Sequence, residues 1–88
     1  MPVKVTRLSF RIEERKQDRK TDLWRVWSLQ GGTYLGEVSW WAHWRKYTFR
    51  PIADSVFDGD CLREIATFCE LETQNHRSGR RTFADQES

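Results

Sequence analysis

The chain has 88 residues, 38% of them hydrophobic, which suffices for one domain with a small core. Fifteen basic residues are balanced by thirteen acidic ones, so the net charge of +2 does not by itself indicate a polyanionic partner. The sequence shows neither a signal peptide nor an apolar run of about 18 residues, which argues against a membrane protein and predicts a protein of the reducing cytoplasm.

The first third of the chain predicts two β-strands and the turn into a third. Residues 6–14 alternate apolar with polar side chains, a period of two that indicates a strand with one face in water. Residues 15–22 contain no apolar side chain, and we interpret them as a solvated hairpin loop, with a phosphate-binding loop as the alternative. Residues 23–29 are rich in strand formers, and the pair Gly31 and Gly32 predicts a tight hairpin turn.

Two further strands are expected over residues 33–41 and 44–50. In the first of them Gly36 costs stability, so we expect a bulge there or a large ring from a neighbouring strand lying over it. Alternation places Tyr34, Gly36, Val38 and Trp40 on one face. In the last strand it places Trp44, Lys46, Thr48 and Arg50 on one face and Arg45, Tyr47 and Phe49 on the other, and Pro51 ends the strand.

Residues 56–73 predict the single helix. Asp58 is a good N-cap, and Phe57 before it can pack on Leu62 as a hydrophobic staple. The apolar stripe of this helix recurs at three- and four-residue steps: Cys61, Leu62, Ile65, Phe68 and Cys69. We therefore predict an α+β fold, a four-stranded antiparallel β-meander followed by one C-terminal helix packed on one sheet face, in a single domain over residues 1–75 with a flexible polar tail over 76–88.

The motifs of common enzymes and metal sites are missing from this sequence. The two cysteines are eight residues apart on the predicted helix, too far to bridge, and neither histidine lies at a zinc spacing from them. Asp58 and Asp60 are accounted for by helix capping, and neither a nucleophile motif nor a phosphate-binding glycine loop appears. We expect no metal, no cofactor and no enzymatic activity.

The segment from Val38 to Pro51 concentrates aromatic and basic side chains. If Trp40, Tyr47 and Phe49 face the helix, the opposite sheet face carries Trp41, Trp44, Lys46 and Arg50, to which the second strand can add Arg25 and one of its tryptophans. Rings beside cations suit a stacked base or a phosphate-bearing ligand. The same residue types are enriched in cores and dimer interfaces, so both interpretations stay open. The candidate binding residues are Trp41, Trp44, Arg45, Lys46, Arg50, Arg25 and Trp27.

Three stretches carry a resemblance to a known family: Leu35-Gly36-Glu37-Val38-x-Trp40, then Trp44-Arg45-x-Tyr47-x-Phe49-x-Pro51, then Val56-Phe57 with Cys61-Leu62-x-Glu64-Ile65-x-x-Phe68. Over residues 23–75 the chain resembles a family of short uncharacterised proteins of bacteriophages and bacterial genomes. The resemblance implies a phage or prophage context, in which small cytoplasmic proteins often act by binding, for example as nucleotide sponges or blockers of host defence.

We therefore expect a non-enzymatic binding protein, assembled as a homo-oligomer, that sequesters a nucleotide-like ligand or docks on a host protein. Within it, Trp44 and Arg45 are expected to matter more than the loop residue Arg19, although alternation also allows Arg45 to pair with Glu64 or Glu70 of the helix. The alternative is an RNA or single-stranded DNA binder. It would hold phosphates with Arg7, Arg11, Arg15, Lys16, Arg19 and Lys20.

Overall fold

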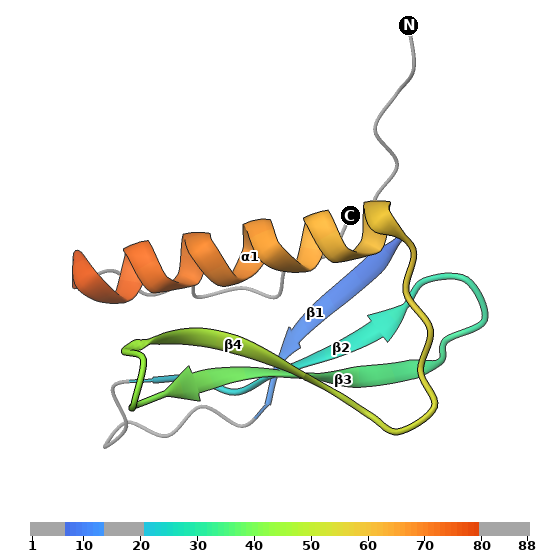
Figure 1. The fold of residues 1–88 in the computed structure, drawn as a ribbon, viewed down its shortest axis with the longest axis horizontal. Coiled ribbons are helices and arrows are strands. Elements are labelled where there is room, and N and C mark those ends of the chain that lie inside the picture. Colours follow the sequence, from blue (N-terminus) through green and yellow to red (C-terminus); the bar gives the residue numbers. More distant parts are fainter. Residues whose placement is uncertain (1–6, 14–20, 80–88) are drawn as a thin grey trace, which may run out of the picture.

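The computed structural model describes residues 7–13 and 21–79, which form a four-stranded antiparallel sheet with one long helix on it (Figure 1). The strands follow one another across the sheet in chain order. The predicted α+β meander with a C-terminal helix is thereby confirmed. The elements are β1 (Leu8–Ile12), β2 (Trp24–Ser28), β3 (Tyr34–Trp41), β4 (Lys46–Pro51) and α1 (Gly59–Arg77).

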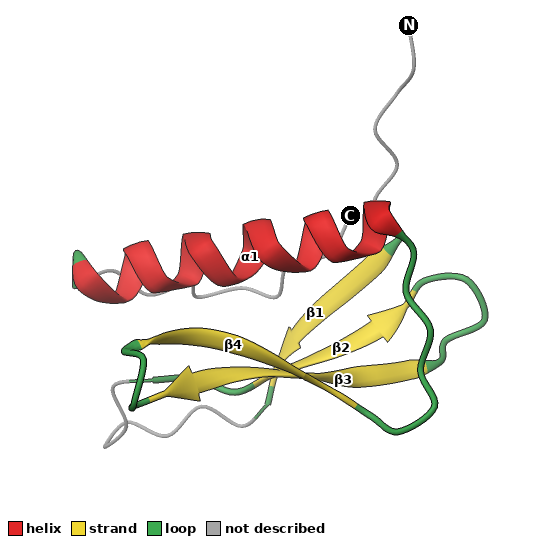
Figure 2. Ribbon diagram, viewed as in Figure 1, coloured by secondary structure: helices red, strands yellow, loops and turns green. Residues whose placement is uncertain are grey.

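The core fills the space between α1 and the sheet face beneath it (Figure 2). Phe68 of the helix is at its centre, stacked on Phe10 at 4.1 Å between ring centroids and met edge-on by Trp24 at 4.9 Å. Such offset and edge contacts add to the burial of the rings. Because the strands alternate, every second residue joins this core, and its buried members are Leu8, Phe10, Trp24, Val26, Val38, Tyr47, Ile65 and Phe68.

Glycines shape the sheet at the two places where the sequence predicted it. Gly31 and Gly32 both have positive φ, 82° and 65°, in the turn between β2 and β3. Gly36 has a φ of 148°, and the pairing of β2 with β3 shifts register next to it. The ring of Phe49 and the backbone of β4 lie against Gly36, so both the predicted bulge and the predicted neighbouring ring are present.

The helix begins as predicted and ends later. The Asp58 carboxylate accepts a hydrogen bond of 2.9 Å from the backbone N–H of Cys61, so it is the N-cap. Helical structure continues to Arg77, past residue 76, where the tail was expected to start. The buried face is also longer than the predicted stripe, since it includes Glu72 and Thr73.

The two residues of the expected hydrophobic staple differ in their surroundings. Phe57 packs edge-on against Phe49 of β4, with 5.4 Å between the ring centroids, whereas Leu62 is 51% exposed. The prediction that Leu62 belongs to the buried stripe was therefore wrong. Its position lies at the margin of that stripe, where the width of the sheet and not the helical period decides burial.

The predicted loop over residues 15–22 and the tail lie largely outside the described residues, together with the basic residues of the loop: Arg15, Lys16, Arg19 and Lys20. Asp22 is described and is buried, and its N–H donates to the Tyr47 hydroxyl at 3.0 Å. At this residue the expectation of a solvated loop was wrong. Among the described residues, no helix has the length and apolar character that crossing a membrane requires.

An open sheet face as the candidate binding site

The sheet face turned away from α1 carries the side chains that alternate with the core, and no described helix or strand lies over it. We call it the open face. Its members come from all four strands: Ser9, Arg11, Arg25, Trp27, Tyr34, Glu37, Ser39, Trp41, Lys46, Thr48 and Arg50. It therefore contains most of the residues that the sequence singled out.

A row of charged residues crosses the middle of the open face. Arg11 pairs with Arg25 across β1 and β2, Arg25 pairs with Glu37, and Glu37 pairs with Arg50 of β4. Cross-strand neighbours on one face lie close enough for their side chains to interact. Three guanidinium groups and the Glu37 carboxylate thus share a single line, and with the Glu13 carboxylate that pairs with Arg25 the row keeps a net charge of about +1.

Arg25 is already engaged within the protein. Its Nε and Nη2 donate to the Glu13 carboxylate at 2.8 to 3.0 Å, and its Nη1 donates to the Tyr34 hydroxyl at 2.8 Å. These hydrogen bonds, that of Glu13 first, raise the pKa of Arg25 above its ordinary value. Arg25 of β2 therefore links Glu13, at the end of β1, to Tyr34 of β3. A ligand would have to displace Glu13 before it could form the same hydrogen bonds with Arg25.

One end of the open face holds Trp27 and Tyr34. Their ring centroids are 5.0 Å apart, with an interplanar angle of 55°. Beside them is a depression of about 400 Å³ whose floor includes Ser9, and the hydroxyl of Ser9 accepts a hydrogen bond of 3.1 Å from Arg11 Nε. This end lies next to the turn between β2 and β3.

Tyr34 was placed on the wrong face by the sequence pattern. Alternation from Val38 puts it on the core face, but it pairs with Trp27 on the open face, because the bulge beside Gly36 inserts Leu35 and reverses the alternation. Leu35 packs against the core instead. A bulge shifts every residue beyond it to the other face, so no period-based prediction could have found Tyr34.

The other end of the open face holds Trp41 and Trp44. Their ring centroids are 6.1 Å apart at an interplanar angle of 60°, and the Arg50 guanidinium lies 4.9 Å from the centroid of Trp41. Lys46 is the cross-strand partner of Trp41. Trp41 is 37% exposed, whereas Trp44 is 64% exposed. Trp41 is thus occupied by its neighbours, and Trp44 is the ring with a face free for stacking.

The turn between β3 and β4 corrects the predicted start of the last strand. The N–H groups of Trp44 and Arg45 both donate to the carbonyl oxygen of Trp41, at 3.2 and 2.8 Å, so these two residues belong to the turn and β4 starts at Lys46. Arg45 has a positive φ of 55° and is exposed. The predicted place of Arg45 on the Tyr47 face of the strand was therefore wrong, because a tight turn breaks the alternation.

The two aromatic ends are far apart. Trp41 is seven positions after Tyr34 along β3, a distance of about 23 Å at about 3.3 Å per residue. Figure 1 shows the β2–β3 and β3–β4 turns at opposite ends of the sheet. Of the predicted site residues, the structure brings together Trp41, Trp44, Lys46 and Arg50, with Arg45 in the adjoining turn. Arg25 lies in the same row as Arg50 with Glu37 between them, and Trp27 lies at the other end of the face.

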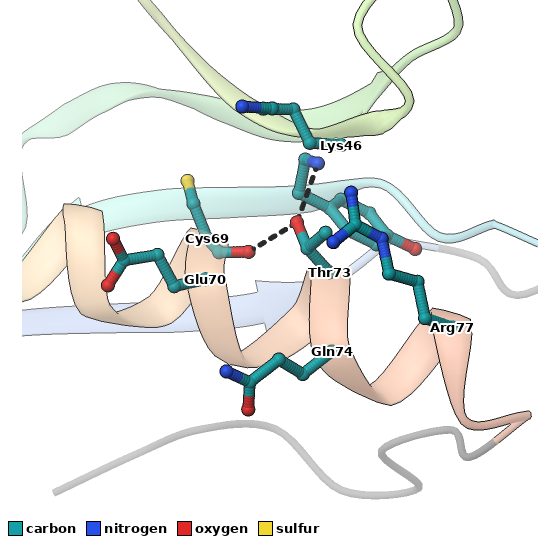
Figure 3. Close-up of a pocket in the computed structure, with 7 residues that line it drawn as sticks. Lys46, Cys69, Glu70, Thr73, Gln74 and Arg77 are labelled. Carbon is teal, nitrogen blue, oxygen red and sulfur yellow. Dashed lines mark hydrogen bonds between the residues drawn. The ribbon is translucent and has the colours of Figure 1, made fainter.

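A second hollow lies at the seam between β4 and the C-terminal half of α1 (Figure 3). We call this space of about 430 Å³ the seam cavity; it is lined by Lys46, Tyr47, Cys69, Glu70, Thr73, Gln74 and Arg77. In its wall the Thr73 hydroxyl accepts the N–H of Tyr47 at 2.9 Å and donates to the carbonyl oxygen of Cys69 at 2.7 Å. Sequence reasoning missed this cavity, since its residues are divided between two elements that are distant along the chain.

The cysteines are poor nucleophiles. Burial, with a smaller effect of the Glu70 charge, raises the pKa of Cys69 to about 11, and burial is the largest cause of the raised pKa of Cys61. Both thiols therefore stay protonated near pH 7. Among residues 7–13 and 21–79 no three His, Cys, Asp or Glu side chains gather as metal ligands would.

The chain is similar to a small phage protein. It is 32% identical over 68 residues to the "Uncharacterized 9.3 kDa protein" of Acholeplasma phage L2, an alignment that spans 77% of this chain and 87% of the phage protein. The chain belongs to the family of this phage protein. No family model matches the chain. No solved structure matches it either.

Proposed function

We propose that this member of the phage family is a non-enzymatic binding protein, and that the Trp44 end of its open face holds a nucleotide-like ligand. The observation that supports this best is the exposed ring of Trp44, which packs edge-on against Trp41, while Arg50 lies over the Trp41 ring and Lys46 is its cross-strand partner. A base stacked on an aromatic ring is stabilised by about 1 to 3 kcal/mol, and nearby cations favour the phosphates attached to it. One short strand end thus offers both kinds of contact.

The biological role that fits such a site in a phage protein is sequestration of a host nucleotide signal in the host cytoplasm, which would counter a host defence. Docking on a host protein through the same rings is the competing outcome, since exposed Trp and Arg are also typical of protein interfaces. We further propose that the pattern of tryptophans, glycine and proline over residues 35–68 marks the whole family.

We expect no turnover from the two cysteines or the capping aspartate, because these three groups are protonated or already engaged. The Cys61 and Cys69 thiols are protonated near pH 7, and the Asp58 carboxylate is used as a helix cap and as the partner of Arg7 at 2.9 Å. A nucleophile or a general base needs a group that is both ionised and unengaged.

The test is a calorimetric and fluorescence titration with a panel of nucleotides. Trp44→Ala should weaken binding by about 5-fold to 150-fold, the equivalent of about 1 to 3 kcal/mol of lost stacking. Trp27→Ala is the matched control, because it removes the same ring from the far end of the same face. Equal losses from both variants, or no heat and no quenching with any nucleotide, would rule out the proposed site.

RNA or single-stranded DNA is the second candidate ligand. It is favoured by the Trp27 and Tyr34 pair about 23 Å from Trp41, with the arginine row between them, because a longer strand could stack at both ends. This version predicts that affinity rises with oligonucleotide length and falls steeply with salt. It also predicts that Trp27→Ala weakens binding as much as Trp44→Ala, so the same pair of variants separates the two candidates.

We also propose that the protein self-associates, because exposed tryptophans on an uncovered sheet face would favour aggregation of a monomer. Native mass spectrometry reports the subunit number and any carried ligand in one spectrum. A purely monomeric spectrum at micromolar concentration would exclude the homo-oligomer.

A further inference from the structure

The seam cavity adjoins the Trp44 end of the open face. Lys46 belongs to both, since it is the cross-strand partner of Trp41 and also lines the cavity. It follows Trp44 by two residues, and Figure 1 shows the β3–β4 turn and the last turn of α1 at the same end of the molecule. A ligand stacked on Trp44 can therefore extend past Lys46 toward the helix.

We infer that the seam cavity receives the phosphate groups of the ligand whose ring stacks on Trp44, so that the ligand class is a nucleotide and not a nucleoside. This inference rests on the proposed function. The cavity is lined by two cations, Lys46 from β4 and Arg77 from α1, against one carboxylate, Glu70. Its volume of about 430 Å³ lies within the ordinary range of small-molecule sites, about 300 to 1,000 Å³.

Arg77 is an exposed residue that lines this cavity and extends toward the β3–β4 turn. Its Nη2 lies 3.4 Å from the carbonyl oxygen of Arg45, a long hydrogen bond that a phosphate could replace. The preceding residue, His76, packs on Trp40 with 4.3 Å between ring centroids, which fixes the helix end against β3. In Figure 3 the side chain of Arg77 reaches from the helix toward β4.

The carbonyl oxygens at the end of α1 oppose this role, because a helix C-terminus repels anions. Two of them are already satisfied, since the N–H groups of Ser78 and Gly79 donate to the carbonyl oxygens of Gln74 and His76 at 3.0 and 3.1 Å. Arg77 adds a full positive charge in the same turn. The local balance therefore favours an anion at the cavity, with Glu70 as the remaining repulsive group.

The experiment compares adenosine with ATP by calorimetry on the full chain. Arg77→Ala and Lys46→Ala should each weaken ATP binding by about tenfold, the usual effect of losing a charge-assisted hydrogen bond, and should leave adenosine binding unchanged. Glu70→Gln should strengthen ATP binding, because it removes the repulsive carboxylate without shortening the side chain. Arg63→Ala is the matched control, an exposed arginine of the first helical turns whose partner is Asp60 at 2.6 Å.

The outcomes separate the two proposals. If ATP and adenosine bind equally well, or if the cavity variants weaken both to the same degree, the phosphate site is refuted while stacking on Trp44 stands. If neither compound nor any other nucleotide binds, the proposed function fails and this inference fails with it. If Arg77→Ala perturbs folding, Glu70→Gln still tests the inference, because it should raise the affinity for ATP. A lower ATP affinity in Glu70→Gln would overturn the inference.

Discussion

Replacing Gly36 with alanine tests how closely β3 and β4 approach each other beside the open face. The backbone φ of 148° is one that L residues rarely adopt, at a cost of about 1 to 3 kcal/mol. A Cβ at this position would overlap the carbonyl oxygen of Arg50 and lie 2.9 Å from the Cα of Pro51 and 3.0 Å from a ring carbon of Phe49. Overpacking of this kind costs about another 1 to 3 kcal/mol.

Gly36→Ala should therefore lower the free energy of unfolding by about 2 to 6 kcal/mol, a large part of the roughly 5 to 15 kcal/mol of a typical domain. Urea denaturation followed by tryptophan fluorescence measures it. Gly32→Ala is the matched control: its φ of 65° is also positive, but no atom lies within 4 Å of the added Cβ, so only about 1 to 2 kcal/mol should be lost. Equal losses in the two variants would refute the close approach of β4 to Gly36.

Two more variants test the ends of α1. Thr73→Val leaves the buried N–H of Tyr47 without its acceptor and should lower the free energy of unfolding by about 1 to 3 kcal/mol. Thr73→Ser keeps the hydroxyl and should lower it by less. Equal denaturation midpoints for the two variants would contradict a role for the hydroxyl. Asp58→Ala should lower the melting temperature by about 5 °C at pH 7, and Asp60→Ala by less, because only Asp58 caps the helix. Hydrogen bonds from Cys61, then the charge of Arg7, lower the pKa of Asp58 in the folded state, so its contribution is complete above the ordinary pKa of 3.8 and is lost as the pH falls through the folded value. The difference between wild type and Asp58→Ala should shrink below about pH 4, and a difference that persists to pH 2 would contradict the cap.

The fold was predictable because its determinants are local. The period of two in the strands, the paired glycines of the β2–β3 turn, the cap at Asp58 and the three- and four-residue steps of α1 each act within a few neighbours along the chain. These signals agree with one another, and such agreement is what specifies a single structure. The Gly36 bulge was also anticipated, because a glycine inside a strand usually marks a bulge or a close approach of another backbone or ring.

The geometry of the candidate site was predicted only in part, because it depends on breaks in the local pattern. The bulge moved Tyr34 to the open face, and the tight turn removed Trp44 and Arg45 from β4. The engagement of Arg25 by Glu13 and Tyr34 is a contact between three strands, and it turns a predicted ligand contact into a brace. Arg77 was not predicted, because its contact with the β3–β4 turn joins residues that are 32 positions apart along the chain.

Trp44 is an exposed residue in the β3–β4 turn, but the strands on either side of this turn are fixed by contacts with α1. This bears on the affinity of the proposed site for its ligand. The N–H of Tyr47 in β4 donates a hydrogen bond to Thr73 of α1, and His76 of α1 packs on Trp40 of β3. Arg77 adds a long hydrogen bond to the carbonyl oxygen of Arg45 in the turn. The helix therefore contacts both strands that flank the turn. A side chain on a rigid support loses less conformational entropy when a ligand binds, and this smaller entropic cost raises the affinity. The length of α1 would therefore matter for the proposed site, because the last turn of the helix packs on Trp40 through His76 and carries Arg77.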